Sequence, residues 1–284
     1  MPWFRRFDGD VVRTTGTRAI MPFLIPTRAG ATVFFEQELD VTRAQAFCDA
    51  RRAAGQKLTI FHLYTYCVVK VLAERPRLNR FTSGSNLYQR KEIELSFSAK
   101  KSLSDDAAMV AIKRRFDASA DFASHLERLG GGVKEGRSNE KNQTDKELSI
   151  LLRLPSFLLR GLIGLARWLD ARNLLPKALI ESDPLYCSVF VANLGSVGLD
   201  AVYHHLYEWG NCPIFAALGR VREVERGGEL RKVCTVKYAF DERIEDGLYC
   251  ARSLERLREH LEGWPEDPDE PPVRGDASST PEVV

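Results

Sequence analysis

The spacing of apolar residues along the chain predicts an alternation of strands and helices. Residues 31–41 alternate partly between apolar and polar side chains, which is typical of a strand. A helical stretch follows from Thr42 to Gly55, and residues 58–76 are apolar on several sides, which predicts a deeply buried helix. The segment 18–30 mixes Pro, Thr, Arg and Gly, and we expect it to be irregular.

The second half of the chain continues this pattern. Residues 81–101 predict a hairpin, residues 185–195 predict a buried strand that ends in a glycine turn, and Gly227 with Gly228 joins two further strands in a tight turn. After Asp246 the apolar residues recur at three- and four-residue spacing, which predicts a helix with one buried face. The expected buried positions are Leu248, Ala251, Leu254, Leu257 and Leu261.

Shifts in composition divide the chain into three parts. We expect a lead-in over 1–17, one folded domain over 18–263, and an acidic, disordered tail over 264–284. Inside the domain, the polar and glycine-rich residues 130–147 predict a flexible loop. Residues 148–176 predict a basic amphipathic helical insertion.

The helical insertion carries Arg153, Arg160 and Arg167 at seven-residue spacing, so they share roughly one face of a helix among apolar side chains. One interpretation is a helix that docks through 148–170 on a membrane surface or on a protein partner. The other is a helix packed on the body of the protein with arginines at its rim. We favour the packed helix because Pro155 and two glycines weaken a long free helix.

Composition and charge narrow the classes of function. The chain has 284 residues with 41 basic and 39 acidic side chains, and a net charge of +2 gives no general attraction to nucleic acid. Six cysteines without a paired motif indicate a reducing compartment rather than a disulfide framework. We find no apolar signal-peptide core and no window of about 18 apolar residues that predicts a spanning helix. We therefore expect a cytoplasmic protein.

Three segments of the second half carry recognisable motifs: FVANLGSVGLDA (190–201), PIFAALGRV (213–221) and FDERIEDGLYCARSLERLREHLE (240–262). In this order they resemble the catalytic domain of 2-oxo acid dehydrogenase acyltransferases, which shares its fold with chloramphenicol acetyltransferase. LAERPRLNRF (72–81) adds a weaker similarity. The resemblance implies an α/β fold with a mixed sheet flanked by helices, and a homotrimer with active sites between subunits. It begins near residue 18, so we expect no lipoyl domain and no complete acyltransferase subunit.

The resemblance also implies positions for the chemistry. In that family, the histidine of the motif D-H-R-x-x-D/N-G takes the proton from the thiol of coenzyme A or dihydrolipoamide, and a hydroxyl residue before Asn-x-Gly binds the oxyanion. The histidine position is Glu242 here, beside Asp246, and the hydroxyl position is Ala192. Coenzyme A or acyl-coenzyme A would lie at Ala192, Asn193 and Gly195. The positions that keep the family residue are Asn193, Gly195, Arg243, Asp246 and Gly247.

Both replacements affect the catalytic step itself. The pKa of a thiol, about 8.5, lies about two units above that of histidine and about four above that of glutamate. Proton transfer to Glu242 is therefore uphill by about 6 kcal/mol, against about 3 kcal/mol for histidine, unless burial raises the carboxyl pKa. Alanine at position 192 removes an oxyanion donor, a loss of about 10²–10³ in rate. The two changes together argue against the ordinary reaction of the family.

Other bases are available in the sequence. His204 and His205 lie between the expected oxyanion strand and the next strand, and a histidine pair at a subunit interface has a suitable pKa for proton transfer. The alternative, which we favour, is a structural turn packed on neighbouring aromatic residues. Of the remaining histidines, we expect His62 in the core, and His125 and His260 on the surface.

The four carboxylates within 241–246 raise the question of a metal site. They supply oxygen ligands for a hard cation, but their spacing matches no calcium loop. The family motif explains them better, with Asp246 as a cap of the following helix and Arg243 neutralising a neighbour. We expect no metal here.

Two hypotheses follow from the sequence. The leading one is an acyltransferase-like trimeric binding or scaffold protein that has lost the usual His/Ser catalytic pair. The alternative is a diverged coenzyme A-dependent acyltransferase that uses His204, His205 or Glu242 as its base.

Overall fold

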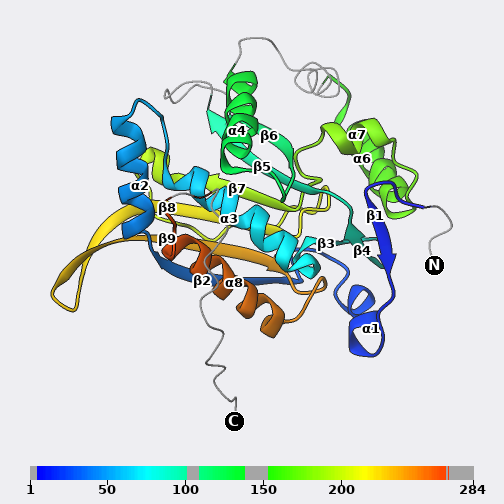
Figure 1. Ribbon diagram of the computed structural model, residues 1–284. Helices are drawn as coiled ribbons and strands as arrows, with labels where there is room; N and C mark the ends of the chain where they lie inside the picture. The colour runs from blue at the N-terminus through cyan, green and yellow to red at the C-terminus, as the bar shows by residue number, and fades with distance from the viewer. Residues whose placement is uncertain (1–4, 101–108, 138–152, 267, 269–284) are drawn as a thin grey trace.

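A computed structural model describes residues 5–100, 109–137, 153–266 and 268 (Figure 1). Its centre is a six-stranded sheet in the order β2-β9-β8-β7-β5-β6. Strand β7 is parallel to both β5 and β8, and the other neighbouring pairs are antiparallel, so the sheet is mixed, as expected. The strands are β2 (Thr32–Asp40), β5 (Ile93–Lys100), β6 (Met109–Phe116), β7 (Val189–Asn193), β8 (Ile214–Arg226) and β9 (Glu229–Asp241).

A second sheet lies at one end of the large one and has the order β1-β4-β3 (Figure 1). Strands β3 (Arg80–Ser83) and β4 (Asn86–Arg90) form the hairpin predicted within 81–101, while the later part of that range joins the large sheet as β5. Strand β1 (Gly9–Val12) pairs with β4. The range 1–17 is therefore more than a lead-in, and the sequence pattern misses β1 because four residues are too few to show a period.

Helices α2 (Thr42–Ala53), α3 (Ile60–Glu74), α4 (Phe122–Arg137) and α8 (Gly247–Glu262) cover one face of the large sheet (Figure 1). Nine of the fifteen residues of α3 are buried, which confirms the buried helix expected at 58–76. The main hydrophobic core lies between these helices and the sheet.

The opposite face of the large sheet carries a smaller apolar cluster centred on Phe190 and Phe215, which stack at 5.1 Å between ring centroids. Helices α6 (Ser156–Ala171) and α7 (Lys177–Ser182) lie beside the small sheet (Figure 1). The remaining elements are α1 (Thr17–Leu24) and the 3₁₀ turns η1 (Pro76–Asn79) and η2 (Leu194–Val197).

Three segments differ from the sequence expectation. Residues 17–24 form α1 instead of an irregular lead-in. Residues 130–137 complete α4, so the first part of the loop expected at 130–147 is helical, and 138–147 lie outside the described residues. Phe122, His125 and Leu129 of α4 are buried, and this packing outweighs the low helix propensity of three glycines, about 1 kcal/mol each.

The segment expected as a disordered tail begins with a core residue. Trp264 is buried, and its ring centroid lies 5.7 Å from that of Phe47 and 5.4 Å from that of Phe122. A single tryptophan before a polar stretch gives no periodic signal, which explains the error. Residues 267 and 269–284 lie outside the described residues.

Helix α8 confirms the predicted helix after Asp246 but turns a different face to the core. Leu257 and Leu261 are buried as expected and Leu254 is partly buried, whereas Leu248 is 63 % exposed and Ala251 is exposed. The small residues Cys250 and Ser253 take the buried positions instead. A helix that lies close to the sheet and to α3 accepts these smaller side chains where leucine is too large.

Candidate functional site

The acidic motif at the end of β9 begins with a buried ion pair. The Asp241 carboxylate accepts from Nε of Arg243 at 2.8 Å and from its Nη2 at 2.7 Å, and both residues are buried. Arg243 also donates through Nη1 to the carbonyl oxygens of Ile25 and Pro26, each at 3.1 Å. The expected neutralising role of Arg243 is thus confirmed, and the pair fixes the strand end against the segment before β2.

Two further carboxylates of the motif have structural partners. Glu245 is buried and accepts from Nη1 of Arg80 at 2.8 Å. The Asp246 carboxylate accepts from the backbone N–H of Tyr249 at 2.8 Å, and this hydrogen bond lowers the pKa of Asp246. Asp246 is therefore the N-cap of α8, as predicted.

Glu242, at the catalytic histidine position of the family motif, is different. It is half-buried, and its backbone N–H donates to the carbonyl of Ala31 at 3.0 Å. Within the described part of the chain, its carboxylate has no hydrogen bond and no ion pair. The same residues contain no group of three or more His, Cys, Asp or Glu side chains arranged to hold a metal.

The turn after β7 holds the other half of the expected site. Ala192 is half-buried and packs against the small apolar cluster on the face of the large sheet opposite the helices. The carbonyl of Asn193 accepts from the Ser196 hydroxyl at 2.7 Å. A Cβ atom on Gly195 would lie 2.6 Å from the carbonyl oxygen of Gly219, so only glycine fits here. A Cβ on Gly247 would meet nothing within 4 Å, so the space around this residue does not require glycine.

The strand register separates the two halves within one chain. Ala192 pairs with Ala217 on β8, and Ala217 pairs with Lys237 on β9. Glu242 lies five residues beyond Lys237, which is about 17 Å along the strand, and two strand spacings add about 10 Å across the sheet. Ala192 and Glu242 are thus roughly 20 Å apart in one chain and form no joint site there.

His204 lies on the same sheet face as Ala192. The His204 ring stacks on Phe215 with 4.0 Å between centroids, and Phe215 pairs with Phe190, two residues before Ala192 on the same sheet face. The Nδ1 atom of His204 lies 2.7 Å from the carbonyl oxygen of His205. That contact requires a proton on Nδ1 and leaves Nε2 as the only position able to accept one in the neutral ring.

Two other histidines have well-defined surroundings. His125, expected on the surface, is buried, with its Nε2 3.1 Å from the Thr65 hydroxyl, and burial lowers its pKa to about 3. His125 follows Phe122 by three residues and precedes Leu129 by four, so helical spacing places it on the buried face of α4. His62, expected in the core, is half-buried, and its Nδ1 lies 2.8 Å from the Thr59 hydroxyl.

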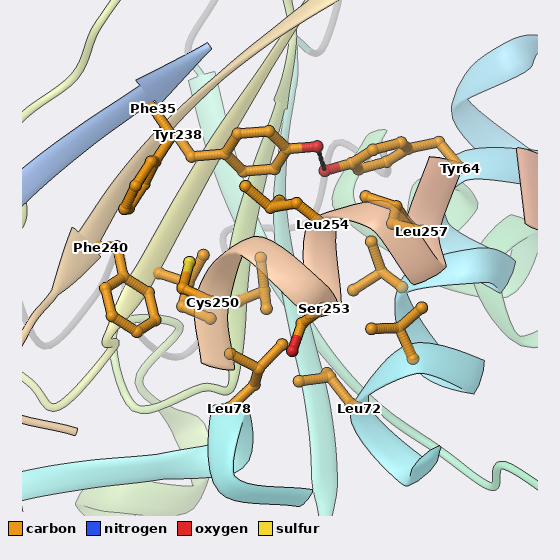
Figure 2. Close-up of a pocket in the computed structure, with 14 residues that line it drawn as sticks. Phe35, Tyr64, Leu72, Leu78, Tyr238, Phe240, Cys250, Ser253, Leu254 and Leu257 are labelled. Carbon is orange, nitrogen blue, oxygen red and sulfur yellow. Dashed lines mark hydrogen bonds between the residues drawn. The ribbon is translucent and has the colours of Figure 1, made fainter. Parts of the chain in front are cut away.

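An apolar cavity of about 50 Å³ lies on the helix side of the large sheet, between the sheet, α3 and α8 (Figure 2). At one end the Tyr64 hydroxyl donates to the Tyr238 hydroxyl at 3.3 Å, and Tyr238 donates to Oε1 of Gln37 at 3.2 Å. Burial raises the pKa of both tyrosines. The cavity contains none of the seven predicted site residues, so it does not extend the predicted site.

A polar cavity of about 210 Å³ lies between the 26–28 segment, the β3–β4 turn, α6 and residues 208–210. Arg243 is the motif residue that reaches it. Its other polar walls include Arg28, Arg167 and Tyr186. The sequence indicates Arg167 only as one of three arginines on a helix face, and it gives no sign of Arg28 or Tyr186 because isolated residues form no pattern.

Helix α6 has no buried residue and presents large apolar side chains to solvent. Arg160 and Arg167 belong to it, while Arg153 precedes it and residues 148–152 lie outside the described residues. Its apolar contact with the body runs through Ala166 and Leu169, and Asp170 at the same end of the helix pairs with Arg6 at 2.8 Å. The packed interpretation therefore holds for one side of the helix alone. In the described part of the chain, no helix is both long and apolar enough to cross a membrane.

No protein-family model matches the sequence, and a search of curated proteins gives no match. Solved structures match over most of the chain. A probable dihydrolipoamide acetyltransferase of Listeria monocytogenes matches with a TM-score of 0.58 and 14 % identity, over 89 % of this chain and 94 % of that one. A dihydrolipoamide acetyltransferase of Azotobacter vinelandii, studied for the catalytic role of a serine, a histidine and an asparagine, matches with 0.57 and 16 %, over 88 % and 91 %.

A chloramphenicol acetyltransferase matches with a TM-score of 0.52 and 12 % identity, over 89 % of this chain and 99 % of that one. The cubic core of a pyruvate dehydrogenase multienzyme complex is similar too, with a TM-score of 0.51 and 16 % identity over 88 % and 91 %. The chain therefore has the chloramphenicol acetyltransferase-like fold of these catalytic domains, as the three sequence motifs predict.

Proposed function

We propose that this protein is a homotrimer that binds coenzyme A or an acyl-coenzyme A without transferring the acyl group. The observation that carries the proposal is the division of the motif residues. The positions that hold the fold keep the family residue and make structural contacts, as Arg243, Asp246 and Gly195 do. The positions that would perform the reaction are Ala192 and Glu242.

The similar structures support the location of this loss. The Azotobacter enzyme was studied for a serine, a histidine and an asparagine, and the motifs place these residue types at positions 192, 242 and 246. This chain has Ala, Glu and Asp there. Alanine donates no hydrogen bond to an oxyanion, and an ionised carboxylate repels a developing thiolate.

The roughly 20 Å between Ala192 and Glu242 within one chain supports a site shared between copies. The face of the large sheet opposite the helices offers a surface for this contact, with exposed apolar side chains at Phe34, Val202 and Tyr203. The rings of Phe34 and Tyr203 meet edge to face at 5.4 Å, so the surface is preformed. Contiguous apolar surface of this kind marks an interface in soluble proteins. A trimer of about three times 32.1 kDa is the expected assembly.

The test puts the family's serine and histidine back at positions 192 and 242. Light scattering first measures the mass, and titration calorimetry measures coenzyme A binding. Acyl transfer from acetyl-coenzyme A is then assayed for the natural chain and for a variant with Ala192→Ser and Glu242→His. We expect a trimer that binds coenzyme A, no turnover in the natural chain, and turnover in the double variant. Glu242→Gln, which supplies no base, is the matched control. A monomer, or a chain without affinity for coenzyme A, would overturn the proposal.

His204 supports a second candidate, an acyltransferase with a relocated base. Its Nε2 is free to accept a proton, and its ring lies on the same sheet face as Ala192. In this case the natural chain turns over acetyl-coenzyme A, and His204→Gln abolishes the reaction while leaving coenzyme A affinity unchanged. His205→Gln serves as the control, and Glu242→Gln tests the carboxylate as base.

We also propose that α6 lies on an anionic lipid surface. At about 100° per residue, Phe157, Leu158, Leu165 and Trp168 fall within an exposed arc of about 100°. Arg160 and Arg167 lie together on one side of this arc, about 60–80° from Phe157, and residues 153–169 contain no carboxylate. Arginine heads beside an apolar stripe with an interfacial tryptophan match the charge and depth of a headgroup layer.

Vesicle sedimentation tests this surface. The protein should sediment with phosphatidylcholine vesicles that contain a quarter phosphatidylserine and stay soluble with phosphatidylcholine alone. Leu165→Ser should release it, and Leu230→Ser, on the β8–β9 hairpin and at least as exposed, should not. If Leu165→Ser instead lowers the mass in light scattering, the stripe is a contact between copies and the membrane proposal is wrong.

A further inference from the structure

The polar cavity near α6 is built around arginines. Its walls include the guanidinium groups of Arg28, Arg167 and Arg243, with Tyr186, Glu208 and Trp209 between them. These residues come from five separate parts of the chain and meet because α6 closes over the end of the small sheet (Figure 1). At about 210 Å³ the cavity exceeds the volume of several waters at about 30 Å³ each.

The charges on the cavity wall do not balance. Arg243 is neutralised by Asp241 behind it, and Asp170, also on the wall, is paired with Arg6 at 2.8 Å. This leaves the two guanidinium groups of Arg28 and Arg167 facing the single carboxylate of Glu208. Two positive charges minus one negative charge give an excess of one positive charge.

Glu208 is itself largely occupied. Its carboxylate accepts from the backbone N–H of Arg28 at 3.2 Å and from that of Ala29 at 2.8 Å, and it lies 3.9 Å from Arg167. The backbone contacts lower the pKa of Glu208, although burial alone acts in the opposite direction. The negative charge of Glu208 therefore stabilises the 28–29 turn more than it neutralises the arginines across the cavity.

One buried donor on the wall lacks an acceptor, and a second donor, the Tyr186 hydroxyl, makes no hydrogen bond to the described residues. The Nε of Arg28 makes no hydrogen bond, although the side chain is only 7 % exposed and the nearest carboxylate oxygen, on Asp241, is 3.7 Å away. Burial lowers the pKa of Arg28 more than the charge of Asp241 raises it. Tyr186 is 1 % exposed, and its hydroxyl has no hydrogen-bond partner among residues 5–100, 109–137, 153–266 and 268. Buried donors of this kind are normally satisfied.

We propose that the cavity binds a small oxyanion of the phosphate or carboxylate class. Such a ligand accepts from Nε of Arg28 and from the Tyr186 hydroxyl, and it supplies the missing negative charge. Arg28 already donates through Nη1 to the Tyr207 carbonyl at 2.7 Å and through Nη2 to the Thr82 carbonyl at 3.4 Å, so its Nε is the donor left for the anion. Arg167, half-exposed on α6, lies at the mouth, where it attracts the anion from solvent. This site is independent of the coenzyme A site proposed above, because none of its walls belongs to the Ala192 turn or to Glu242.

Titration calorimetry with inorganic phosphate, at an ionic strength held constant with sodium chloride, tests the site, and a second titration uses acetate. We expect millimolar or tighter binding of at least one of the two. The anion that binds more tightly identifies the source, a phosphoryl group or a carboxylate. Heat no larger than that of a chloride titration, for both anions, would overturn the proposal.

Helix α6 offers a matched pair of variants. Arg167→Gln should weaken binding about tenfold, whereas Arg160→Gln removes the same charge from the same helix outside the cavity and should leave the affinity unchanged. Glu208→Gln keeps an acceptor for the 28–29 turn, removes the competing charge and should tighten binding. Equal weakening by Arg167→Gln and Arg160→Gln would reveal diffuse attraction to α6 and contradict a defined site. Both arginines are exposed, so folding does not obscure the comparison.

Discussion

Asp241 and Arg243, two residues apart in the chain, face one another through two parallel N–H···O contacts of 2.8 and 2.7 Å in the interior of the protein. The same carboxylate lies 3.7 Å from Nε of Arg28, so one negative charge faces two cations at the junction of the large sheet, the small sheet and the segment before β2. This chain keeps both motif residues although it has Glu242 in place of the motif histidine. The contacts of Asp241 and Arg243 indicate that this part of the motif serves the architecture.

Removing one partner of this pair should therefore destabilise the whole molecule. We expect Asp241→Asn to lower the free energy of unfolding by about 3–5 kcal/mol, because it leaves the Arg243 charge buried without a counter-ion. Urea denaturation measures the change. Asp200→Asn is the control, since Asp200 pairs with Arg220 on the surface and should change the stability by less than about 1 kcal/mol. Equal effects of the two variants would contradict this account.

The N-cap of α8 makes a smaller and more local contribution. Asp246→Ala removes the acceptor of the Tyr249 N–H and should lower the free energy of unfolding by about 1 kcal/mol. Asp246→Asn keeps an acceptor and should recover most of this loss. Thermal and urea unfolding of the three chains decide the matter. A loss as large with asparagine as with alanine would assign the effect to charge alone.

Two glycines of the family motifs should respond in opposite ways to alanine. Gly195→Ala forces a Cβ to within 2.6 Å of the Gly219 carbonyl oxygen and should lower the free energy of unfolding by about 1–3 kcal/mol. Gly247 begins α8 with open space around it, so Gly247→Ala should raise stability by up to about 1 kcal/mol. The denaturation midpoints of the two variants should move in opposite directions. A loss with Gly247→Ala would indicate a contact with another copy of the chain.

Stability should fall as the solution becomes acidic, partly through His125. In the unfolded chain this histidine binds a proton near pH 6.5, whereas burial lowers its folded pKa to about 3. The unfolded state therefore binds more protons between these values, and His125 favours unfolding progressively as the pH falls below 6.5. At pH 5 the loss relative to pH 7 should be about 2 kcal/mol. His125→Gln should flatten this part of the pH profile, and an unchanged slope would contradict it.

Long elements with a clear period were predictable from the sequence. Strand β2, helices α2 and α3, the hairpin at Gly227 and Gly228, and the cap at Asp246 occur where the pattern places them, because each depends on local spacing or turn chemistry. The mixed sheet was predicted from the family motifs rather than from the spacing of apolar residues. A pattern identifies a buried strand, but it does not say which strand lies beside it.

The remaining features depend on contacts between distant segments. His125 is buried by the sheet and α3, Trp264 fills a space between Phe47 and Phe122, and β1 exists because β4 offers it an edge. The structure places Ala192 near the end of β7 and Glu242 directly after β9. The distance between them follows only from the strand register, and the arginine cavity follows only from the folding of α6 over the small sheet.

The β8–β9 hairpin extends beyond the rest of the large sheet (Figure 1). From Arg222 to Arg226 on β8 and from Glu229 to Val233 on β9, each strand pairs mainly with the other, while β2 and β7 flank the parts nearer the core. Arg222 and Arg226 both pair with Glu38, which ties the base of this arm to β2. A two-stranded ribbon is only marginally stable by itself. Amide hydrogens near the tip should therefore exchange with deuterium much faster than those of Val236 or Ala239, further along β9, so that one continuous strand contains both fast- and slow-exchanging backbone.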